Sequence, residues 1–391
     1  MKRVVAEKIE DVVSESPAGV SSRKSKKAAA SADEFAADTG FSRDVIDWQK
    51  QHGRHALPWQ NTRDAYRVWL SEIMLQQTQV AAVIPYYARF LESFPTIQSL
   101  AAASSEQVMA HWSGLGYYSR ARNLHKCAQA VVAQHGGVFP ADPDLLEQLP
   151  GIGRSTAAAI SAFSYGTRAA ILDGNVKRVF ARVFGIDRFP GEKAVENDMW
   201  LRAVALLPET GVESYTQGLM DLGATLCTRN RPACNRCPLA HRCVAFASGR
   251  TAELPVRKPK KKVPEKHATM LVIVNGDQVL LEQRPDSGIW GGLLSLPEVA
   301  PTDNDVIDFE RVVAPFGTTA STARLPAFSH VFTHFKLHVT PYRIDLSRRL
   351  QIAAQHNHAW YPVRAMAEAP LPAPVKKLLL AIFREPDLLS Q

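Results

Sequence analysis

Apolar residues recur three and four positions apart through most of the chain between residues 41 and 249. This spacing places them on one face of a helix, and few segments in this range alternate with the period of two that is typical of a strand. The pattern predicts an all-α region, with helices within Tyr66–Phe94, Leu100–Met109, Ala121–Val132 and Thr156–Phe163. Breaks between helices are expected at Pro58, Pro85, Pro95, Pro140 and Pro150.

The pattern changes after residue 268. Thr269–Val274 and Gln278–Gln283 read as strands joined by a hairpin turn at 275–277, and Phe335–Thr340 alternates apolar and polar side chains as a strand does. Helical spacing returns over Pro374–Phe383. We therefore expect a multidomain protein with a separate α+β domain at residues 268–388.

Two segments have too few apolar residues to form a core. Residues 1–40 are rich in Ser, Ala, Lys and acids, and we expect a disordered N-terminal arm. Residues 250–267 contain three prolines and a run of basic side chains, which predicts an extended linker between the two folded regions.

Composition limits the class of protein. The 391 residues carry a formal charge of +8, which suits a polyanionic partner such as nucleic acid. No stretch approaches the roughly 20 apolar residues of a membrane span, and acidic residues follow Met1 too soon for a signal peptide. We expect a protein of the cytoplasm with no membrane partner.

Four of the five cysteines fall within a short segment, spaced C-x6-C-x2-C-x5-C. Thiolates at such intervals can surround one metal centre. A zinc ribbon usually has two C-x2-C pairs, and this segment has one. The predicted metal ligands are Cys227, Cys234, Cys237 and Cys243.

The segment Leu149–Ala157 predicts a tight glycine turn that leads into a helix, within a helix-hairpin-helix at about 145–165. Gly151 and Gly153 allow the backbone to approach a ligand closely, and the N–H groups at the new helix start attract an anion. Arg154 and Ser155 follow directly in the same turn.

Two carboxylates are candidates for acid–base chemistry. Asp173 precedes a glycine at a predicted helix start, where it can also act as an ordinary cap. Glu72 lies in an apolar helix beside Trp69, Ile73 and Leu75, and burial there would raise its pKa so that it holds a proton at neutral pH.

Together these motifs resemble the MutY family of adenine DNA glycosylases, within the endonuclease III-like superfamily. The resemblance covers residues 41–390 and is carried by LPWQ at 57–60, WLSEIMLQQTQV at 69–80, GLGYYSRARNLHK at 114–126, LPGIGRSTA at 149–157, LDGNVKRV at 172–179 and the cysteine segment. It implies an all-α helix-hairpin-helix glycosylase with a [4Fe-4S] cluster held at 227–243. The implied substrate is adenine mispaired with 8-oxoguanine, or with guanine, in duplex DNA.

The resemblance also assigns roles to residues. Glu72 matches the general acid, and Asp173 matches the carboxylate that stabilises the sugar cation. Ser155 stands where bifunctional relatives carry a Schiff-base lysine, which implies a monofunctional enzyme. The remaining DNA-contact candidates are Trp59, Gln77, Thr78, Leu115, Tyr117 and Gln217, in addition to Gly151, Gly153 and Arg154.

The C-terminal region resembles a MutT-like Nudix domain. The sequence contains no REXXEE segment after Pro297, so we expect the fold without the hydrolase activity. Phe328, Ser329 and His330 match a loop that reads 8-oxoguanine, whereas His334 and His338 are expected to be ordinary strand residues.

Three alternatives remain open from the sequence. The chain could be an endonuclease III-like glycosylase and lyase acting on oxidised pyrimidines, a nucleotide pyrophosphohydrolase, or a non-catalytic binder of damaged DNA. Ser155 argues against the lyase, and the missing acidic helix argues against the pyrophosphohydrolase. The presence of both carboxylates argues against a non-catalytic binder. We expect a monomer that is associated with the nucleoid when bound to DNA.

Overall fold

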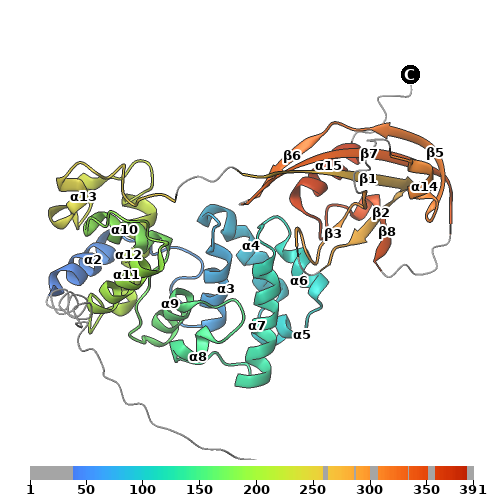
Figure 1. The fold of residues 1–391 in the computed structure, drawn as a ribbon. Coiled ribbons are helices and arrows are strands. Elements are labelled where there is room, and N and C mark those ends of the chain that lie inside the picture. The colour runs from blue at the N-terminus through green and yellow to red at the C-terminus, as the bar shows by residue number, and fades with distance from the viewer. Residues whose placement is uncertain are drawn as a thin grey trace, which may run out of the picture.

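The structure is a computed structural model that describes residues 38–258, 263–285, 288–299, 307–332, 334–350 and 357–384. Two helical lobes lie beside a mixed sheet (Figure 1). This arrangement confirms the predicted all-α region followed by an α+β domain. Most of the predicted N-terminal arm lies outside the described residues. The first helix begins at Thr39, inside the range predicted for the arm, because the Asp38 carboxylate accepts from the Phe41 N–H and caps it.

The first helical lobe joins the start of the helical region to its end. Phe41, Phe180 and Tyr215 are buried together at its centre. Its helices are α2 (Thr39–His52), α10 (Gly174–Val183), α11 (Lys193–Ala205), α12 (Val212–Asp221) and α13 (Val244–Ala247). Short turns η1 (Leu222–Leu226), η2 (Cys234–Arg236) and η3 (Ala240–Arg242) connect α12 to α13.

The second helical lobe contains the helices between α2 and α10. Trp69, Phe90 and Trp112 are fully buried in its core. Its helices are α3 (Ala65–Leu75), α4 (Val80–Ser93), α5 (Ile97–Ala102), α6 (Ser105–Trp112), α7 (Ser119–His135), α8 (Pro143–Glu147) and α9 (Arg154–Tyr165).

The predicted Tyr66–Phe94 stretch is not one helix divided at its proline. Pro85 lies inside α4, and the chain instead breaks at residues 76–79, between α3 and α4. The apolar spacing continues across this break because the residues on both sides enter the same core. The break exposes Gln77 at a turn.

The C-terminal domain is built on one mixed sheet with the strand order β3-β2-β1-β7-β5. β1 and β7 are parallel, while β4, β6 and β8 pair antiparallel with β1, β7 and β2. The strands are β1 (Glu265–Asn275), β2 (Gln278–Gln283), β3 (Leu294–Ser295), β4 (Glu298–Val299), β5 (Gly317–Arg324), β6 (Phe328–Val331), β7 (Lys336–Arg349) and β8 (His358–Pro362). The helical elements are α14 (Phe309–Val313), η4 (Val363–Ala365) and α15 (Ala373–Arg384).

Three sequence predictions about this domain need correction. The linker was predicted to extend to residue 267, but β1 begins at Glu265 because its polar start pairs in register with Lys336–Val339 of β7. Phe328–His330 was predicted as a loop, but it lies in β6, which pairs with the same stretch of β7. His334 was predicted in a strand and instead lies in the turn between β6 and β7, whereas His338 lies in β7 as predicted.

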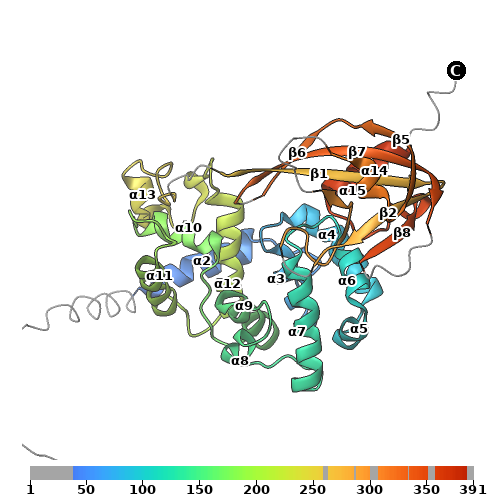
Figure 2. The ribbon, with the colours of Figure 1, turned by 45° about the vertical axis from the view of Figure 1, so that its right-hand side comes forward.

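The sheet packs directly against the second helical lobe. One apolar cluster contains core residues of that lobe together with Met270 and Leu337 from one face of the sheet and Leu379 from α15. Ser113 donates to the backbone carbonyl of Leu371 at 3.1 Å, and Arg122 donates to the carbonyl of Gly291. The view in Figure 2 shows β6 at the end of the sheet nearest the helical lobes. Among the described helices, none is long and apolar enough to cross a membrane.

Candidate active site and DNA-facing residues

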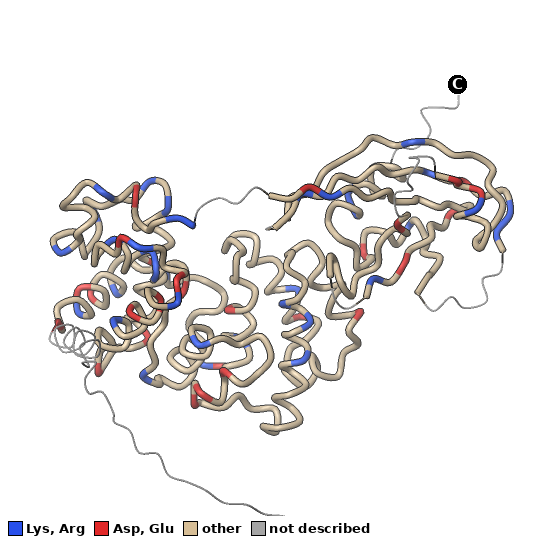
Figure 3. Tube along the Cα trace, in the orientation of Figure 1, with Lys and Arg blue, Asp and Glu red and all other residues tan. Residues whose placement is uncertain are grey.

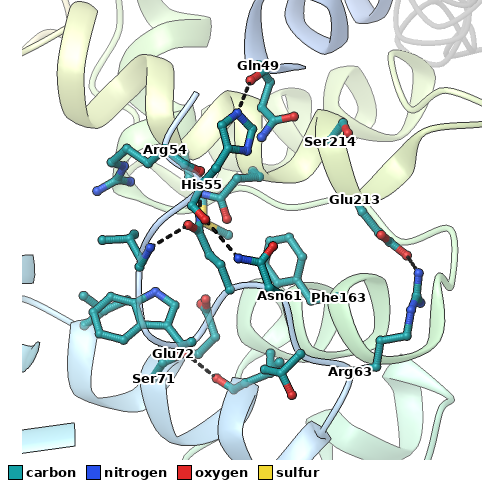
Figure 4. A pocket seen from close by; sticks show the side chains of 18 of the residues that line it. Gln49, Arg54, His55, Asn61, Arg63, Ser71, Glu72, Phe163, Glu213 and Ser214 are labelled. Atoms are coloured by element: carbon teal, nitrogen blue, oxygen red, sulfur yellow. Dashed lines mark hydrogen bonds and ion pairs between the residues drawn. The ribbon is translucent and has the colours of Figure 1, made fainter. Parts of the chain in front are cut away.

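A cavity of about 590 Å³ lies between the two helical lobes. Its walls come from α2, from the loop that joins α2 to α3, and from α3, α9 and α12. Trp59, Glu72 and Gln217, three residues predicted for the site, all line it. Figure 4 shows Glu72 pointing into the cavity, with Phe163 on the wall beside it.

Glu72 is poised to hold a proton. Burial, and secondly the negative charge of Asp173, raise its pKa to about 7. Within the described residues its carboxyl makes no hydrogen bond that would stabilise the ionised form. Leu75 and Phe163 supply apolar surface around it, but Trp69, expected to do so, packs in the core against Phe139 instead, with ring centroids 5.1 Å apart.

Asp173 caps the N-terminus of α10, the ordinary role that its sequence position allowed. Its Oδ1 accepts from the Val176 N–H at 2.8 Å, and its Oδ2 accepts from the Asn175 side chain at 3.0 Å. Burial is the largest influence and raises the pKa of Asp173 above its usual value, and these donors and the nearby Arg178 offset part of that rise. The negative charge of Asp173 helps to raise the pKa of Glu72, so the two carboxyls are close enough to interact electrostatically. The donors and the helix dipole favour Asp173 as the ionised member.

A buried carboxylate organises the far wall of the cavity. Asp221 accepts from the Arg54 backbone N–H and side chain at 2.8 and 2.7 Å and from Gln217 Nε2 at 2.8 Å. Arg54 and Gln217 therefore have fixed orientations where they line the cavity. Trp59 also lines the cavity and is buried, with its ring edge-on to Tyr87.

Gln77 and Tyr117 meet at a second, smaller cavity of about 250 Å³, which Gly151 also lines. Gln77 is exposed, and Tyr117 is 48% exposed. Leu115 is buried beneath this surface, and the Thr78 hydroxyl accepts from Arg120 at 3.1 Å. Of these four candidates, Gln77 and Tyr117 present side chains that DNA can reach, while Leu115 and Thr78 support the turns.

The predicted glycine turn is present before α9. Gly151 has a φ of +78°, and a Cβ there would come within 2.8 Å of the Asn123 side chain on α7, so the position needs glycine. Gly153 precedes α9 and faces open space. The Ser155 hydroxyl accepts from the Leu172 N–H at 2.9 Å, next to Asp173. The Arg154 guanidinium lies over the ring of Trp200, 3.9 Å from its centroid.

The four clustered cysteines surround one small pocket next to α10, and all are free thiols. Arg182 Nη1 donates to Cys227 Sγ at 3.3 Å, and Arg178 Nε donates to the Cys227 carbonyl at 2.7 Å. Burial raises the pKa of the Cys237 thiol to about 11. The described residues contain no group of three or more His, Cys, Asp or Glu side chains arranged around a single metal ion. Four thiol sulfurs that line one pocket are the donor set that an iron–sulfur cluster uses.

The β6 candidates do not face one ligand together. Successive side chains of a strand point to opposite faces, so Ser329 lies opposite His338 on one face while Phe328 and His330 lie on the other. The His330 ring lies 6.2 Å from Trp290 and 4.6 Å from Phe332. The chain repeats the Phe-Ser/Thr-His pattern at 332–334, where His334 lies in the turn and Thr333 is outside the described residues.

Sequence reasoning missed several supporting residues, chiefly Arg54, Asp221, Asn175 and Arg120. The available signal for Asp221 was an acid within the apolar run from Leu219 to Leu222. Asn175 lies within a quoted motif, but its contact with Asp173 needed the structure. Arg54 had no local signal, since Asp221 lies 167 residues away. Arg120 lies within the motif at 114–126, but its contacts with the end of α3 needed the structure.

Comparison with known proteins identifies both parts of the chain. The HhH-GPD superfamily of base excision DNA repair proteins matches residues 70–203, and the NUDIX domain matches residues 269–381. Adenine DNA glycosylase of Buchnera aphidicola subsp. Acyrthosiphon pisum is 36% identical over 340 residues, covering 87% of this chain and 96% of that protein. The Mus musculus adenine DNA glycosylase is 33% identical over 399 residues, covering 87% of this chain and 77% of that protein.

The helical region also has a solved structural relative. A thermostable thymine-DNA glycosylase superposes with a TM-score of 0.50 at 26% identity, covering 55% of this chain and 98% of that chain. The predicted fold class, a helix-hairpin-helix glycosylase region with a Nudix-like domain, is therefore confirmed.

Proposed function

The chain belongs to the adenine DNA glycosylase family, and we propose that its substrate is adenine mispaired with 8-oxoguanine in duplex DNA. Removal of adenine in base excision repair follows from the family itself. The observation that carries the mechanism is the electrostatic coupling of Asp173 to Glu72. Glu72 lines the cavity and has a pKa raised to about 7, whereas Asp173 is not among the residues that line it.

The reaction begins with extrusion of the adenine, because its glycosidic bond cannot be reached inside the duplex. Unstacking costs a few kcal/mol and costs less at a mispair. Gln77 and Tyr117 would enter the base stack, and their exposure at the second cavity beside the glycine turn supports this role. The extruded base then enters the larger cavity, where Trp59 and Gln217 form part of the wall.

Bond cleavage uses the two carboxyls in different protonation states. Glu72 donates its proton to N7 of adenine, so the base leaves as a neutral molecule. The sugar then acquires oxocarbenium character, which ionised Asp173 stabilises. Addition of water gives the abasic product. This division between a protonated and an ionised carboxyl is the same as in glycosidases.

The absence of an amine at position 155 supports a hydrolytic, monofunctional reaction. The Ser155 hydroxyl is engaged by the Leu172 N–H and carries no amine with which to form a Schiff base. A lyase of the endonuclease III type needs such an amine.

The C-terminal domain would recognise 8-oxoguanine through β6 and the turn that follows it. This part of the sheet lies nearest the helical lobes (Figures 1 and 2). Ser329 and His330 point to opposite faces, so only one of them can contact a given base edge directly. The exposed Ser329 is the better candidate for that contact, with His330 and Phe328 supporting the strand from the other face.

Cys227, Cys234, Cys237 and Cys243 would hold a [4Fe-4S] cluster. Such a cluster supplies a covalent tie that fixes the cysteine segment. Figure 3 shows Lys and Arg gathered around this segment and along α10, where they can contact DNA phosphates. We also propose that the protein acts as a monomer on nucleoid DNA.

Single-turnover cleavage tests the substrate, using duplexes that place adenine opposite 8-oxoguanine or guanine, and a third duplex with an oxidised pyrimidine. The proposal expects the fastest release from the first duplex. Preference for the oxidised pyrimidine would favour a lyase-type enzyme and refute it.

The proposed contact between β6 and 8-oxoguanine is tested by the rate of adenine release opposite 8-oxoguanine divided by the rate opposite guanine. Ser329→Ala should lower this ratio, and Val331→Ala is the matched control because it is also exposed on the same face of β6. His334→Ala examines the repeated pattern in the turn. If only His334→Ala changes the ratio, the assignment to Ser329 is wrong.

A further inference from the structure

Arg120, at the start of α7, is a buried cation bound almost entirely by backbone carbonyls. Its side chain is 8% exposed. Nη1 donates to the carbonyls of Ile73, Met74 and Gln76 at 2.9, 2.9 and 2.7 Å. Nη2 donates to the carbonyls of Leu115 and Gly116, each at 3.2 Å, and to the Thr78 hydroxyl. No carboxylate of the described residues pairs with it.

The acceptors of Arg120 come from two separate turns. One group lies at the C-terminus of α3, where carbonyls without helical partners form the negative end of the helix dipole. The other lies in the turn before α7. The guanidinium thus occupies the position of a C-terminal cation for α3, although α3 carries no basic residue in its own last turn.

Both turns contain a non-glycine residue with left-handed backbone. Gln77 has a φ of 59° and Tyr117 a φ of 49°. Each follows a carbonyl that Arg120 binds, since Gln76 precedes Gln77 and Gly116 precedes Tyr117. Holding these carbonyls fixes the peptide plane before each unusual residue. The guanidinium also lies 5.5 Å from the Tyr117 ring centroid and 5.2 Å from that of Trp112.

We propose that Arg120 is a positioning residue that locks Gln77 and Tyr117 in their left-handed conformations and ties both turns to the end of the helix that carries Glu72. This inference rests on the proposed function, in which those two side chains enter the base stack. One guanidinium then sets the spacing between the two inserted side chains and their position relative to the acid.

The test is a double-mutant cycle in the full-length protein. Arg120→Met is measured alone and combined with Gln77→Ala and Tyr117→Ala. The readouts are single-turnover adenine release and the fluorescence of 2-aminopurine placed opposite 8-oxoguanine, which reports base extrusion without cleavage. If Arg120 acts through the two inserted residues, Arg120→Met should lower extrusion and release about 10- to 100-fold in the wild-type background. In the Gln77→Ala/Tyr117→Ala background the further loss should be about twofold or less.

Equal losses in both backgrounds would show a purely structural role and overturn the proposal, as would no loss at all. Arg120→Lys covers the case in which Arg120→Met fails to fold, because a lysine keeps the charge but cannot span both turns as a planar fork does. Arg120→Lys should release adenine at a rate between those of the wild type and Arg120→Met. Its loss should also be smaller in the Gln77→Ala/Tyr117→Ala background than in the wild-type background. Arg188→Met, which removes a surface cation paired with Glu192, is the control for loss of an arginine. The wild-type rate of adenine release on the same duplex tests the proposed function. It does so separately from the proposed role of Arg120.

Discussion

Arg54 binds the buried carboxylate of Asp221 through both its backbone N–H, at 2.8 Å, and its guanidinium, at 2.7 Å. The two residues are 167 positions apart, so this contact joins the loop after α2 to the end of α12. Asp221 also receives the Gln217 amide. One carboxylate thus holds two cavity-lining side chains in place. The positions of these two side chains therefore depend on the negative charge of Asp221.

We expect Asp221→Asn to weaken both the fold and the site. Removing one partner of a buried ion pair typically costs about 3–5 kcal/mol, and the lower end is expected because Arg54 is partly exposed. Urea denaturation should show this loss, and single-turnover release should fall as Arg54 and Gln217 lose their fixed orientation.

Asp198→Asn is the matched control for the buried pair. Asp198 pairs with Arg202 on the surface of α11, and such pairs contribute about 0–1 kcal/mol. If Asp221→Asn and Asp198→Asn destabilise the protein equally, the buried pair does not have the role assigned to it.

The activity should depend on the proton of Glu72. Because the pKa of Glu72 is about 7, the rate of adenine release should fall as the pH rises through 7 and the acid loses its proton. Glu72→Gln should bind the mispaired duplex but release no base. A single-turnover rate that is constant from pH 6 to 8.5 would remove Glu72 from the acid role.

The same pKa predicts that stability, like activity, falls as the pH rises. Protonation of Glu72 stabilises the fold below its unfolded pKa of 4.5, and this contribution is lost as the pH rises through about 7. Glu72→Gln stays neutral, so it should be more stable than the wild type at pH 8.5 by about 3 kcal/mol, and equally stable at pH 4. Urea midpoints at the two pH values measure this. Equal midpoints at pH 8.5 would show that burial does not penalise the ionised acid.

The sequence predicted candidate catalytic residues, but it did not predict the geometry around them. Glu72 and Asp173 stand in short motifs, so each could be put forward as a candidate from the local sequence alone. The break between α3 and α4 could not be identified, because apolar spacing runs through it and the carbonyls at the break are satisfied by Arg120, 44 residues beyond Gln76. Likewise, the polar residues 265–268 form a strand only because β7 pairs with them.

Changing Arg182 should affect both the cysteine segment and α10. Arg182 donates to Cys227 Sγ from α10, the helix that Asp173 caps. Loss of a residue that supports a metal ligand commonly costs about 10- to 100-fold in metal affinity or activity. Arg182→Met should therefore reduce iron content, visible absorbance and adenine release, with partial recovery in Arg182→Lys.

Arg236→Met serves as the control for iron content, since Arg236 is exposed within the same segment. If Arg182→Met keeps full iron content and absorbance, the contact with Cys227 does not support the metal site.

Trp200 should tune DNA binding through Arg154. The Trp200 ring lies under the guanidinium of Arg154, which follows Gly153 at the start of α9, so the ring restrains a cation beside the predicted phosphate contact. Trp200→Leu should weaken binding to matched and mismatched duplexes alike and lower the slope of log affinity against log salt by about 1, as expected for loss of one phosphate contact. Leu201→Ala, at an exposed neighbouring position on α11, should leave the slope unchanged. Should Arg154→Ala lower the slope while Trp200→Leu does not, Arg154 contacts phosphate without help from the ring.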